Sequence, residues 1–243
     1  AADKLVGGEN VVSAVYAGTT TPQALTVTGN EYDEIIGGHH VKQIRNEGAS
    51  GTNLIAVENK VSSITVEDID GVQYIVGGSK SNNSFADLQT GKTTVEIKNG
   101  TIGLTQTSNA DLAVVGGNLL KATFNQGGNV AKASTEETLV NISGTFVGAD
   151  IIAGSKANAY GTTNEAVSLN VFDADTKLVI SSGDFSDAGD IVGGSVADGP
   201  GAHASVTNSN VEITGGIFRG ILRFDTDKDG KEKPVFLRQA VYG

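Results

Sequence analysis

Three aspartates near the end of the chain have the spacing of a calcium-binding loop. Asp225, Asp227 and Asp229 alternate with other residues and are followed by a glycine, as in the first half of an EF-hand loop. Carboxylate oxygens suit Ca²⁺, and the glycine allows the sharp turn that such a loop needs. The twelfth position holds Phe236 in place of the bidentate glutamate, so Glu232 or a backbone carbonyl would have to complete the site. The pattern predicts either a calcium loop outside the EF-hand class or an acidic, solvated turn.

Two adjacent histidines are the second group that could bind a metal. His39 and His40 carry imidazole nitrogens, and His203 is the third histidine of the chain. Because the chain has no cysteine, a closed zinc site would also need carboxylates that the sequence does not identify. Neighbouring residues on a strand point to opposite faces, so at most one of the pair could ligate. The alternative, which we expect, is that both are exposed polar residues at a corner.

Two aspartates could form a catalytic pair. Asp150 and Asp190 precede equivalent phrases of the sequence and would lie one layer apart, about 5 Å, which is the carboxylate separation of a retaining glycosidase. Both occupy the same position of a repeat, however, which a structural turn explains equally well, and no Arg or Lys recurs beside them. We therefore expect that the chain is not an enzyme. A carbohydrate-active enzyme is the alternative.

The phrase Gly-Gly-Ser does not predict a nucleotide site or a serine nucleophile. It lacks the spacing of a phosphate-binding loop, and no helical pattern follows it. Ser155 and Ser195, which end two copies, have no base that the sequence places near them. We expect no cofactor, with calcium at the three aspartates as the single candidate ion.

A short phrase that ends in small residues recurs along the chain and must position these groups. Its copies are Leu5-Val6-Gly7-Gly8, Ile35-Ile36-Gly37-Gly38, Tyr74-Ile75-Val76-Gly77-Gly78-Ser79, Val114-Val115-Gly116-Gly117, Asp150-Ile151-Ile152-Ala153-Gly154-Ser155 and Asp190-Ile191-Val192-Gly193-Gly194-Ser195. The spacing from copy to copy is about 30 to 40 residues, which is typical of repeat architectures. The glycine pair predicts a corner where the backbone either takes a positive φ or approaches another backbone segment closely.

A second phrase, an alternating strand that runs into a glycine turn, accompanies the first. It is clearest over residues 211–218, and further copies begin at Val95, Leu139 and Leu178. Period-two alternation indicates half-buried strands, and no long window has a helical period. A propeller blade needs four strands of similar weight with aromatic anchors, which this chain lacks. We predict an all-β fold, a parallel β-solenoid built from repeats of about 39 residues, each forming one wide coil or two coils of about 20.

Composition excludes several classes of partner. The formal net charge is -11 over 243 residues, and no basic stripe exists to neutralise phosphates, so we expect no nucleic acid. The same charge disfavours an anionic membrane surface. No stretch approaches the roughly 20 apolar residues of a membrane helix, so we expect no transmembrane segment. The absence of cysteine excludes disulfides and thiolate metal sites.

The repeats end near residue 220. We predict that residues 1–220 are solenoid repeats. Residues 221–243 are the most charged stretch, and they either cap the open end or begin the next segment. Because the chain has no initiating methionine and opens almost inside a repeat, we expect a mature product or a piece of a longer polypeptide.

The phrases at residues 190–195 and 211–218, with Ala-, Asn- and Thr-rich loops between copies, resemble the repetitive passenger regions of bacterial autotransporters and related surface adhesins. The resemblance covers roughly residues 5–220. It implies a right-handed parallel β-helix that is exported through the outer membrane. In that family the passenger serves adhesion, self-association or, in some members, proteolysis. The resemblance carries no catalytic residue over to this chain.

We therefore expect a secreted or cell-surface structural β-solenoid whose loops contact a host-cell surface, a glycan or other copies of the chain. The loops that vary most are 80–90, 118–136, 156–166 and 196–205, and we expect the contacts there. Weak contacts along a long face would add up through avidity. The alternatives are a carbohydrate-active β-helix enzyme, either lyase or hydrolase, and a subunit of an extracellular filament whose strand edges pair end to end.

Overall fold

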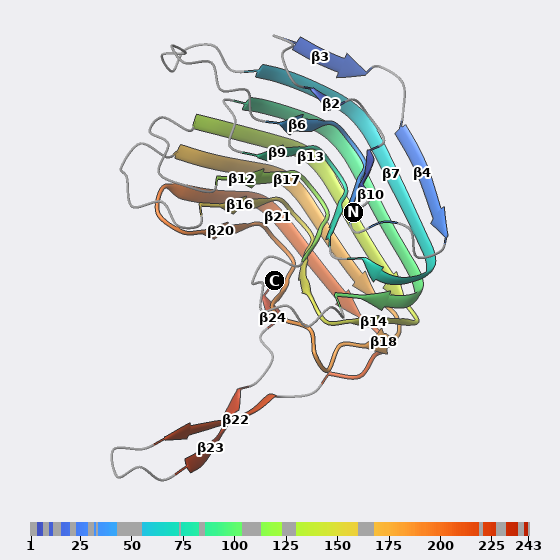
Figure 1. The fold of residues 1–243 in the computed structure, drawn as a ribbon, viewed down its shortest axis with the longest axis vertical. Helices are drawn as coiled ribbons and strands as arrows, with labels where there is room; N and C mark the ends of the chain where they lie inside the picture. Colours follow the sequence, from blue (N-terminus) through green and yellow to red (C-terminus); the bar gives the residue numbers. More distant parts are fainter. Residues whose placement is uncertain are drawn as a thin grey trace.

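The computed structural model shows a chain of parallel β-strands that lie side by side in layers (Figure 1). It describes residues 4–6, 10–11, 16–19, 23–28, 32, 34–42, 55–72, 74–82, 86–103, 113–122, 130–159, 168–218, 221–226, 232–237 and 241–242. These residues contain no helix. Accordingly, no helix that could span a membrane is found among them.

All strands of the described chain except β22 (Ile221–Thr226) and β23 (Glu232–Leu237) belong to three parallel sheets. The first short sheet contains β1 (Lys4–Val6), β5 (Glu34–Ile36), β8 (Tyr74–Val76), β11 (Ala113–Val115), β15 (Asp150–Ile152), β19 (Ile191–Val192) and β24 (Val241–Tyr242). The second short sheet contains β2 (Asn10–Val11), β6 (His40–Lys42), β9 (Lys80–Asn82), β12 (Leu119–Lys121), β16 (Lys156–Asn158) and β20 (Val196–Asp198). The long sheet contains β3 (Tyr16–Thr19), β4 (Gln23–Thr28), β7 (Ile55–Val72), β10 (Ala86–Ile102), β13 (Val130–Ser143), β14 (Thr145–Val147), β17 (Ser168–Ile180), β18 (Gly183–Asp184) and β21 (Ala202–Ile213).

The prediction of an all-β fold with stacked parallel strands is confirmed. Each copy of the glycine phrase contributes one strand to the first short sheet, in the order of the sequence. Hydrogen bonds at the corners join residues 40, 39 and 37 positions apart, in the pairs His39–Ser79, Ser79–Asn118 and Asn118–Ser155. The separations are unequal, so a fixed repeat of about 39 residues stays a prediction. Within the described residues no sheet closes on itself.

The glycine pairs form corners between the two short sheets because neighbouring layers approach closely there. A Cβ on Gly77 would overlap the carbonyl oxygen of Gly116, and a Cβ on Gly116 would overlap that of Ala153. The described glycines of these corners are absent from the positive-φ residues. Close backbone approach, the second of the two predicted reasons, therefore explains the phrase, and the positive-φ reading was wrong. Positive φ occurs instead in the turns that follow the long strands, as at Gly100 (φ 87°) and Gly144 (φ 64°).

Each long strand is bent at one place where its alternation changes phase. In β10 the buried residues are every second residue up to Thr90, then Gly91 and Lys92 both lie outward, and burial resumes at Thr93. The same two-residue step occurs in register at Glu136 and Glu137 of β13. Two consecutive outward residues turn the strand, so one strand can cover both short sheets (Figure 1).

The core consists of like-on-like columns of small aliphatic side chains. One cluster joins the second half of the long sheet to the first short sheet and includes Ile64, Val95, Val140 and Leu178. The other joins the first half to the second short sheet and is rich in alanine. Thin layers of this kind bury Val, Ile, Leu and Ala fully without large aromatic residues. The aromatic-poor composition is therefore compatible with a continuous core.

Several segments that we predicted as loops are strands. Lys80–Asn82 is β9, and the described parts of ranges 80–90, 118–136, 156–166 and 196–205 lie mostly in strands. These strands are only three residues long in the second short sheet, and their pairing with neighbouring layers defines them. A period-two pattern cannot be recognised in so few residues.

The C-terminal stretch leaves the parallel arrangement. β22 (Ile221–Thr226) and β23 (Glu232–Leu237) pair antiparallel, and this hairpin extends away from the stacked sheets (Figure 1). The chain then returns, and β24 pairs in parallel with β19. The division into residues 1–220 and 221–243, and the role of the second part as a cap or as a new segment, stay predictions.

Candidate functional site

One line of polar groups lies inside the corners and connects successive layers. The backbone N–H of His39 donates to Ser79 Oγ (3.0 Å), and that of Ser79 donates to Asn118 Oδ1 (2.8 Å). The N–H of Asn118 donates in turn to Ser155 Oγ (2.9 Å). We call these residues, which directly follow the glycine pairs, the corner line. Its amide groups are used within the fold, which supports our rejection of a phosphate-binding role for Gly-Gly-Ser.

The last residue of the corner line, Ser155, donates hydrogen bonds to a buried carboxylate. Asp173 of β17 is fully buried, and its two oxygens accept the N–H (2.6 Å) and Oγ–H (2.8 Å) of Ser155. Ser195 Oγ donates to the same carboxylate at 2.5 Å. Three donors satisfy the desolvated carboxylate, as a buried charge requires. Asp173 thus joins the layers at Ser155 and Ser195, because both hydroxyls donate to its carboxylate.

A second line of hydroxyls joins the bend of the long sheet to the glycine corners. Ser62 Oγ donates to Gly77 O (2.5 Å), and Thr93 Oγ1 donates to Gly116 O (2.6 Å). Thr176 Oγ1 makes the equivalent bond to Gly193 O (2.6 Å). Ser62 and Thr93 correspond in register, and Thr138 lies between Thr93 and Thr176 in the same row. Thr138 Oγ1 has no hydrogen-bond partner among the described residues, so the bond recurs in three of these four layers. The polar residues inside the fold therefore hold two backbone surfaces together.

The histidine pair is buried, and the expectation of exposed corner residues was wrong. His39 and His40 are 0% and 1% exposed. The N–H of His39 belongs to the corner line, whereas His40 lies in β6 with its Nε2 3.4 Å from Asn82 Nδ2. Among the residues that the structure describes, no group of three or more His, Cys, Asp or Glu is placed to hold a metal ion.

Asp150 and Asp190 lie in neighbouring layers, as the sequence indicated, but they face different partners. Asp150 Oδ1 accepts the backbone N–H of Asp190 at 3.0 Å, and its Oδ2 lies 3.5 Å from Lys156 Nζ. Lys156 approaches Asp150 from the second short sheet, and the equivalent residue after Asp190 is Val196, so a basic residue does not recur at this position. Asp150 fits the structural turn that we considered as the alternative to catalysis.

The predicted calcium ligands fall mostly outside the described residues. Asp225 belongs to β22, where its backbone is opposite Lys233 of β23. Asp227 and Asp229 lie outside the described ranges. The calcium site at these three residues stays a prediction.

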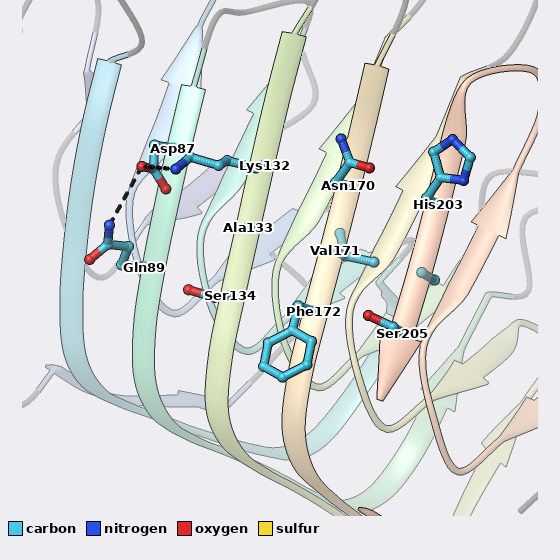
Figure 2. A pocket seen from close by; sticks show the side chains of 11 residues that line it. Asp87, Gln89, Lys132, Ala133, Ser134, Asn170, Val171, Phe172, His203 and Ser205 are labelled. Atoms are coloured by element: carbon cyan, nitrogen blue, oxygen red, sulfur yellow. Dashed lines mark hydrogen bonds and ion pairs between the residues drawn. The ribbon is translucent and has the colours of Figure 1, made fainter. Parts of the chain in front are cut away.

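The outward surface of the long sheet is exposed and regular, and we call it the outer face. Residues in register form rows across it at a spacing of about 4.8 Å. One row consists of Asp87, Lys132, Asn170 and His203, and the next of Gln89, Ser134, Phe172 and Ser205. These two rows line a hollow of about 400 Å³, shown in Figure 2, which we call the Phe172 groove.

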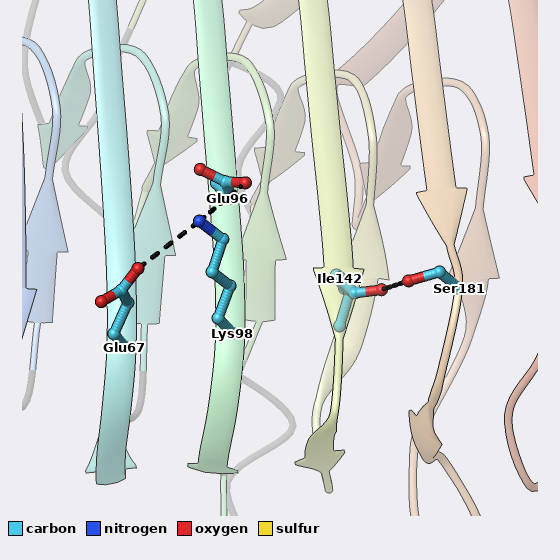
Figure 3. A network of polar contacts seen from close by, with 5 residues as sticks. All are labelled: Glu67, Glu96, Lys98, Ile142 and Ser181. Atoms are coloured by element: carbon cyan, nitrogen blue, oxygen red, sulfur yellow. Dashed lines mark hydrogen bonds and ion pairs between the residues drawn. The ribbon is translucent and has the colours of Figure 1, made fainter.

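Charges on the outer face form pairs between neighbouring strands. Lys132 Nζ lies 2.9 Å from Asp87 Oδ2, and Lys92 Nζ lies 2.6 Å from Glu137 Oε1. Lys98 lies between two glutamates, 3.1 Å from Glu96 and 3.4 Å from Glu67 (Figure 3). The hydrogen bond with Glu96 is the main cause that raises the pKa of Lys98 above its ordinary value. The outer face is thus polar and largely charge-compensated.

Two side chains of β17 were missed in the sequence, Phe172 and Asp173. Leu169 and Val171 point inward, so the next inward residue of this strand is Asp173. Phe172 lies between Val171 and Asp173 and therefore points outward. The aromatic residue therefore faces solvent and the acid faces the core, the reverse of ordinary patterning. The alternation of inward and outward residues in β17 could have predicted both the exposed Phe172 and the buried Asp173.

No protein-family model matches the chain, and comparison with curated proteins and with solved structures finds no significant match. The function of the chain therefore has to be inferred from its fold and from the outer face.

Proposed function

We propose that the chain is a parallel β-solenoid of repeats of about 39 residues that acts as a structural, adhesive segment of a secreted or surface-anchored bacterial protein. The outer face is its contact surface, toward a host-cell surface, a glycan or other copies of the chain. The resemblance to autotransporter passengers supports the location. The coil size is supported by the hydrogen bonds between residues 37 to 40 positions apart.

The observation that carries this proposal is the contrast between a sealed interior and an open outer face. In the interior, polar side chains such as those of Asn118 and Asp173 are hydrogen-bonded to the backbone of a neighbouring layer. The outer face presents hydroxyl, amide and charged side chains in rows, together with one exposed aromatic ring, Phe172. Rows of similar groups at the strand spacing offer many weak contacts to a large partner, which avidity converts to tight attachment.

Binding is better supported than hydrolysis or lyase chemistry. The acids that the sequence singled out, Asp150 and Asp190, are linked by a backbone hydrogen bond, and Asp150 also faces Lys156. The Phe172 groove contains one carboxylate, that of Asp87, which is paired with Lys132. A retaining mechanism needs two carboxylates that flank one bond. The carbohydrate-active enzyme remains the alternative class.

Cell fractionation combined with an adhesion assay tests the proposal. An antibody against this chain is used to blot the cytoplasm, outer membrane and medium of producing cells, and beads coated with the chain are applied to host-cell monolayers. We expect the protein in the outer membrane or medium, and coated beads that adhere more than beads coated with a non-adhesive protein. Protein confined to the cytoplasm, or beads that do not adhere, would contradict an adhesive surface role.

End-to-end self-association is a second candidate, favoured by the last strand of the long sheet. β21 pairs with β17 and ends the strand order of that sheet in the described chain. Near this edge Ile213 and Ile217 are 39% and 49% exposed. Open edges of parallel strands can pair with another chain. A concentration-dependent increase in sedimentation coefficient that Ile213→Lys abolishes is expected, whereas a monodisperse monomer at high concentration would remove this candidate.

A further inference from the structure

The side chain of Phe172 is exposed on a strand that is paired on both sides, where the fold does not require its exposure. Phe172 is 48% exposed, and among the described residues the other exposed large apolar residues are Ile213 and Ile217. Those two lie at or beyond the last strand of the long sheet, where the end of the stacked layers explains their exposure. Phe172 lies on β17, which is paired on both sides, with β13 and β21. The end of the stacked layers therefore does not explain why Phe172 is exposed.

The neighbours of Phe172 leave both sides of its ring accessible. Ser134 on β13 and Ser205 on β21 are its partners in register, and both side chains are small. Figure 2 shows the ring projecting from β17 between these two serines. The next residue of β17 on the same face is Ala174, two residues after Phe172, and its side chain is also small. The ring thus forms one wall of the hollow, with space beside it for a flat ligand.

Polar groups surround the ring on one side. Asn170 lies two residues before Phe172 and therefore on the same face, and Lys132 and His203 are its partners in register. Lys132 is held by Asp87, and Gln89 Nε2 approaches the same carboxylate at 3.5 Å (Figure 2). An amide, an imidazole and two hydroxyls therefore line the same hollow as the aromatic ring, and the Lys132 ammonium group is directed toward Asp87 (Figure 2). The volume of about 400 Å³ lies within the range of roughly 300–1,000 Å³ found for small-molecule sites.

We propose that the Phe172 groove binds a neutral sugar unit of a glycan. This inference rests on the proposed adhesive function and names the ligand class of the outer face. One face of a pyranose ring carries C–H groups that can lie against the Phe172 ring, and its edge carries hydroxyls that Asn170, Ser134 and Ser205 can reach. An anionic sugar is disfavoured, because Asp87 already compensates Lys132 and the chain has a net charge of -11.

The test is the binding of Phe172 variants to an array of oligosaccharides that end in neutral hexoses, N-acetylhexosamines or anionic sugars. The wild-type chain is expected to bind neutral ends, and Phe172→Ala is expected to lower this binding about tenfold, because ring stacking is lost. Phe172→Trp should retain binding. Since the chain contains no tryptophan, the emission of that variant reports contact with the ligand directly.

Two further variants separate loss of the site from loss of the fold. Ser134→Tyr keeps the phenylalanine but fills the space beside it, and is expected to lower binding as Phe172→Ala does. Val179→Ala is the matched control, because Val179 faces outward on the same strand but lies outside the groove. It should bind like the wild type. Far-ultraviolet circular dichroism and the unfolding midpoint of each variant are compared with the wild type, so that misfolded variants are recognised.

The outcomes distinguish this inference from the proposed function. Binding only to anionic ends, no binding to any neutral end, or binding that Phe172→Ala and Ser134→Tyr leave unchanged would each overturn the glycan site. If coated beads adhere to cells but no neutral sugar binds through Phe172, the adhesive function stands and the site is wrong. If neutral sugars bind through Phe172 but coated beads do not adhere, the site stands and the adhesive function is wrong.

Discussion

The corner line and the outer face contain the same kinds of polar residue and differ in what those residues do. In the corner line, Asn118 and Ser155 are fully buried, and their side chains accept backbone N–H groups from the next layer. On the outer face, Ser134 and Asn170 have the same functional groups but face solvent. The side of the strand on which a polar residue lies therefore decides between holding layers together and offering contacts to a partner.

The physical reason is the cost of leaving a polar group without water. A buried donor or acceptor without a partner costs about 1–3 kcal/mol, so interior polar residues must be hydrogen-bonded within the fold. An exposed group exchanges its partner for water at little cost. Substitutions in matched pairs, one inside and one outside, test how far this difference holds.

The largest difference in folding stability between an interior variant and an outer-face variant is expected for ion pairs. Lys80 and Glu34 form a buried pair between β9 and β5, with side chains 7% and 9% exposed. Lys80→Ala leaves the glutamate charge buried without this cation, so we expect a loss of about 3–5 kcal/mol in the free energy of unfolding. Lys92→Ala removes an exposed pair with Glu137 and should cost about 0–1 kcal/mol. Urea unfolding of both variants measures the two values.

A double variant sharpens the interpretation of that result. Glu34→Leu combined with Lys80→Met replaces the buried pair by apolar side chains, and this is expected to recover most of the stability that Lys80→Ala loses. Equal losses for Lys80→Ala and Lys92→Ala would contradict the difference between the two regions.

The second largest loss of stability is expected for a substitution at the glycine corners. Gly116→Ala places a methyl group against the carbonyl oxygen of Ala153 and 2.7 Å from Val140 Cγ2. Because backbone atoms of the neighbouring layer cannot move away freely, we expect a loss of about 3 kcal/mol in thermal or urea unfolding. Ala153→Gly, the matched control at the equivalent position, should change stability by about 1 kcal/mol or less. A neutral Gly116→Ala would show that the layers are not packed as tightly as the structure shows.

Two aspartates of β17 provide a smaller and closely matched comparison. Asp173→Ala removes the buried acceptor of Ser155 and Ser195, and we expect a loss of about 2–3 kcal/mol. Asp173→Asn keeps an acceptor oxygen and should lose less. Asp175→Ala removes an exposed carboxylate that accepts Asn208 Nδ2, and is expected to stay within about 0.5 kcal/mol of the wild type. If the two alanine variants unfold at the same urea concentration, the interior role of Asp173 is wrong.

The smallest effect concerns the titration of the outer face. The pKa of Lys98 is raised above its ordinary value, chiefly by the hydrogen bond with Glu96. A folded pKa above the unfolded value means that the stabilisation is present below about pH 10 and is lost as the pH rises through the folded pKa. In NMR titrations, Glu96→Gln should lower the pKa of Lys98 toward the ordinary value, and Glu67→Gln should lower it less. No shift with either variant would show that the contacts in Figure 3 are not maintained in solution.

The strongest predictions came from the repeated phrases. Residues such as Ile35, Ile75, Val114 and Ile151 were predicted to lie in equivalent strands, and they pair in register in the first short sheet. The phrase was sufficient because layers of a stacked fold place equal residues on equal residues. The wrong predictions concern segments with no such repetition. Lys80–Asn82 was read as a loop, and the bend at Gly91 and Lys92 was not found.

The candidate site was less predictable than the fold. His39 and His40 were expected to be exposed, yet both are buried, and β6, which contains His40, is covered on both sides by its neighbours β2 and β9. Phe172 belonged to no motif, and its importance depends on its register partners Ser134 and Ser205, which lie 38 and 33 residues away in the sequence.

By itself the sequence determined the class of fold, the order of the layers and the positions of the corners. These follow from local composition, since a glycine pair permits close backbone approach and alternation selects the buried side of a strand. Only the tertiary structure decided which polar side chains are exposed and can contact a partner. Whether a serine such as Ser155 or Ser134 is enclosed or exposed depends on the strand that covers it, and that strand comes from a distant part of the chain.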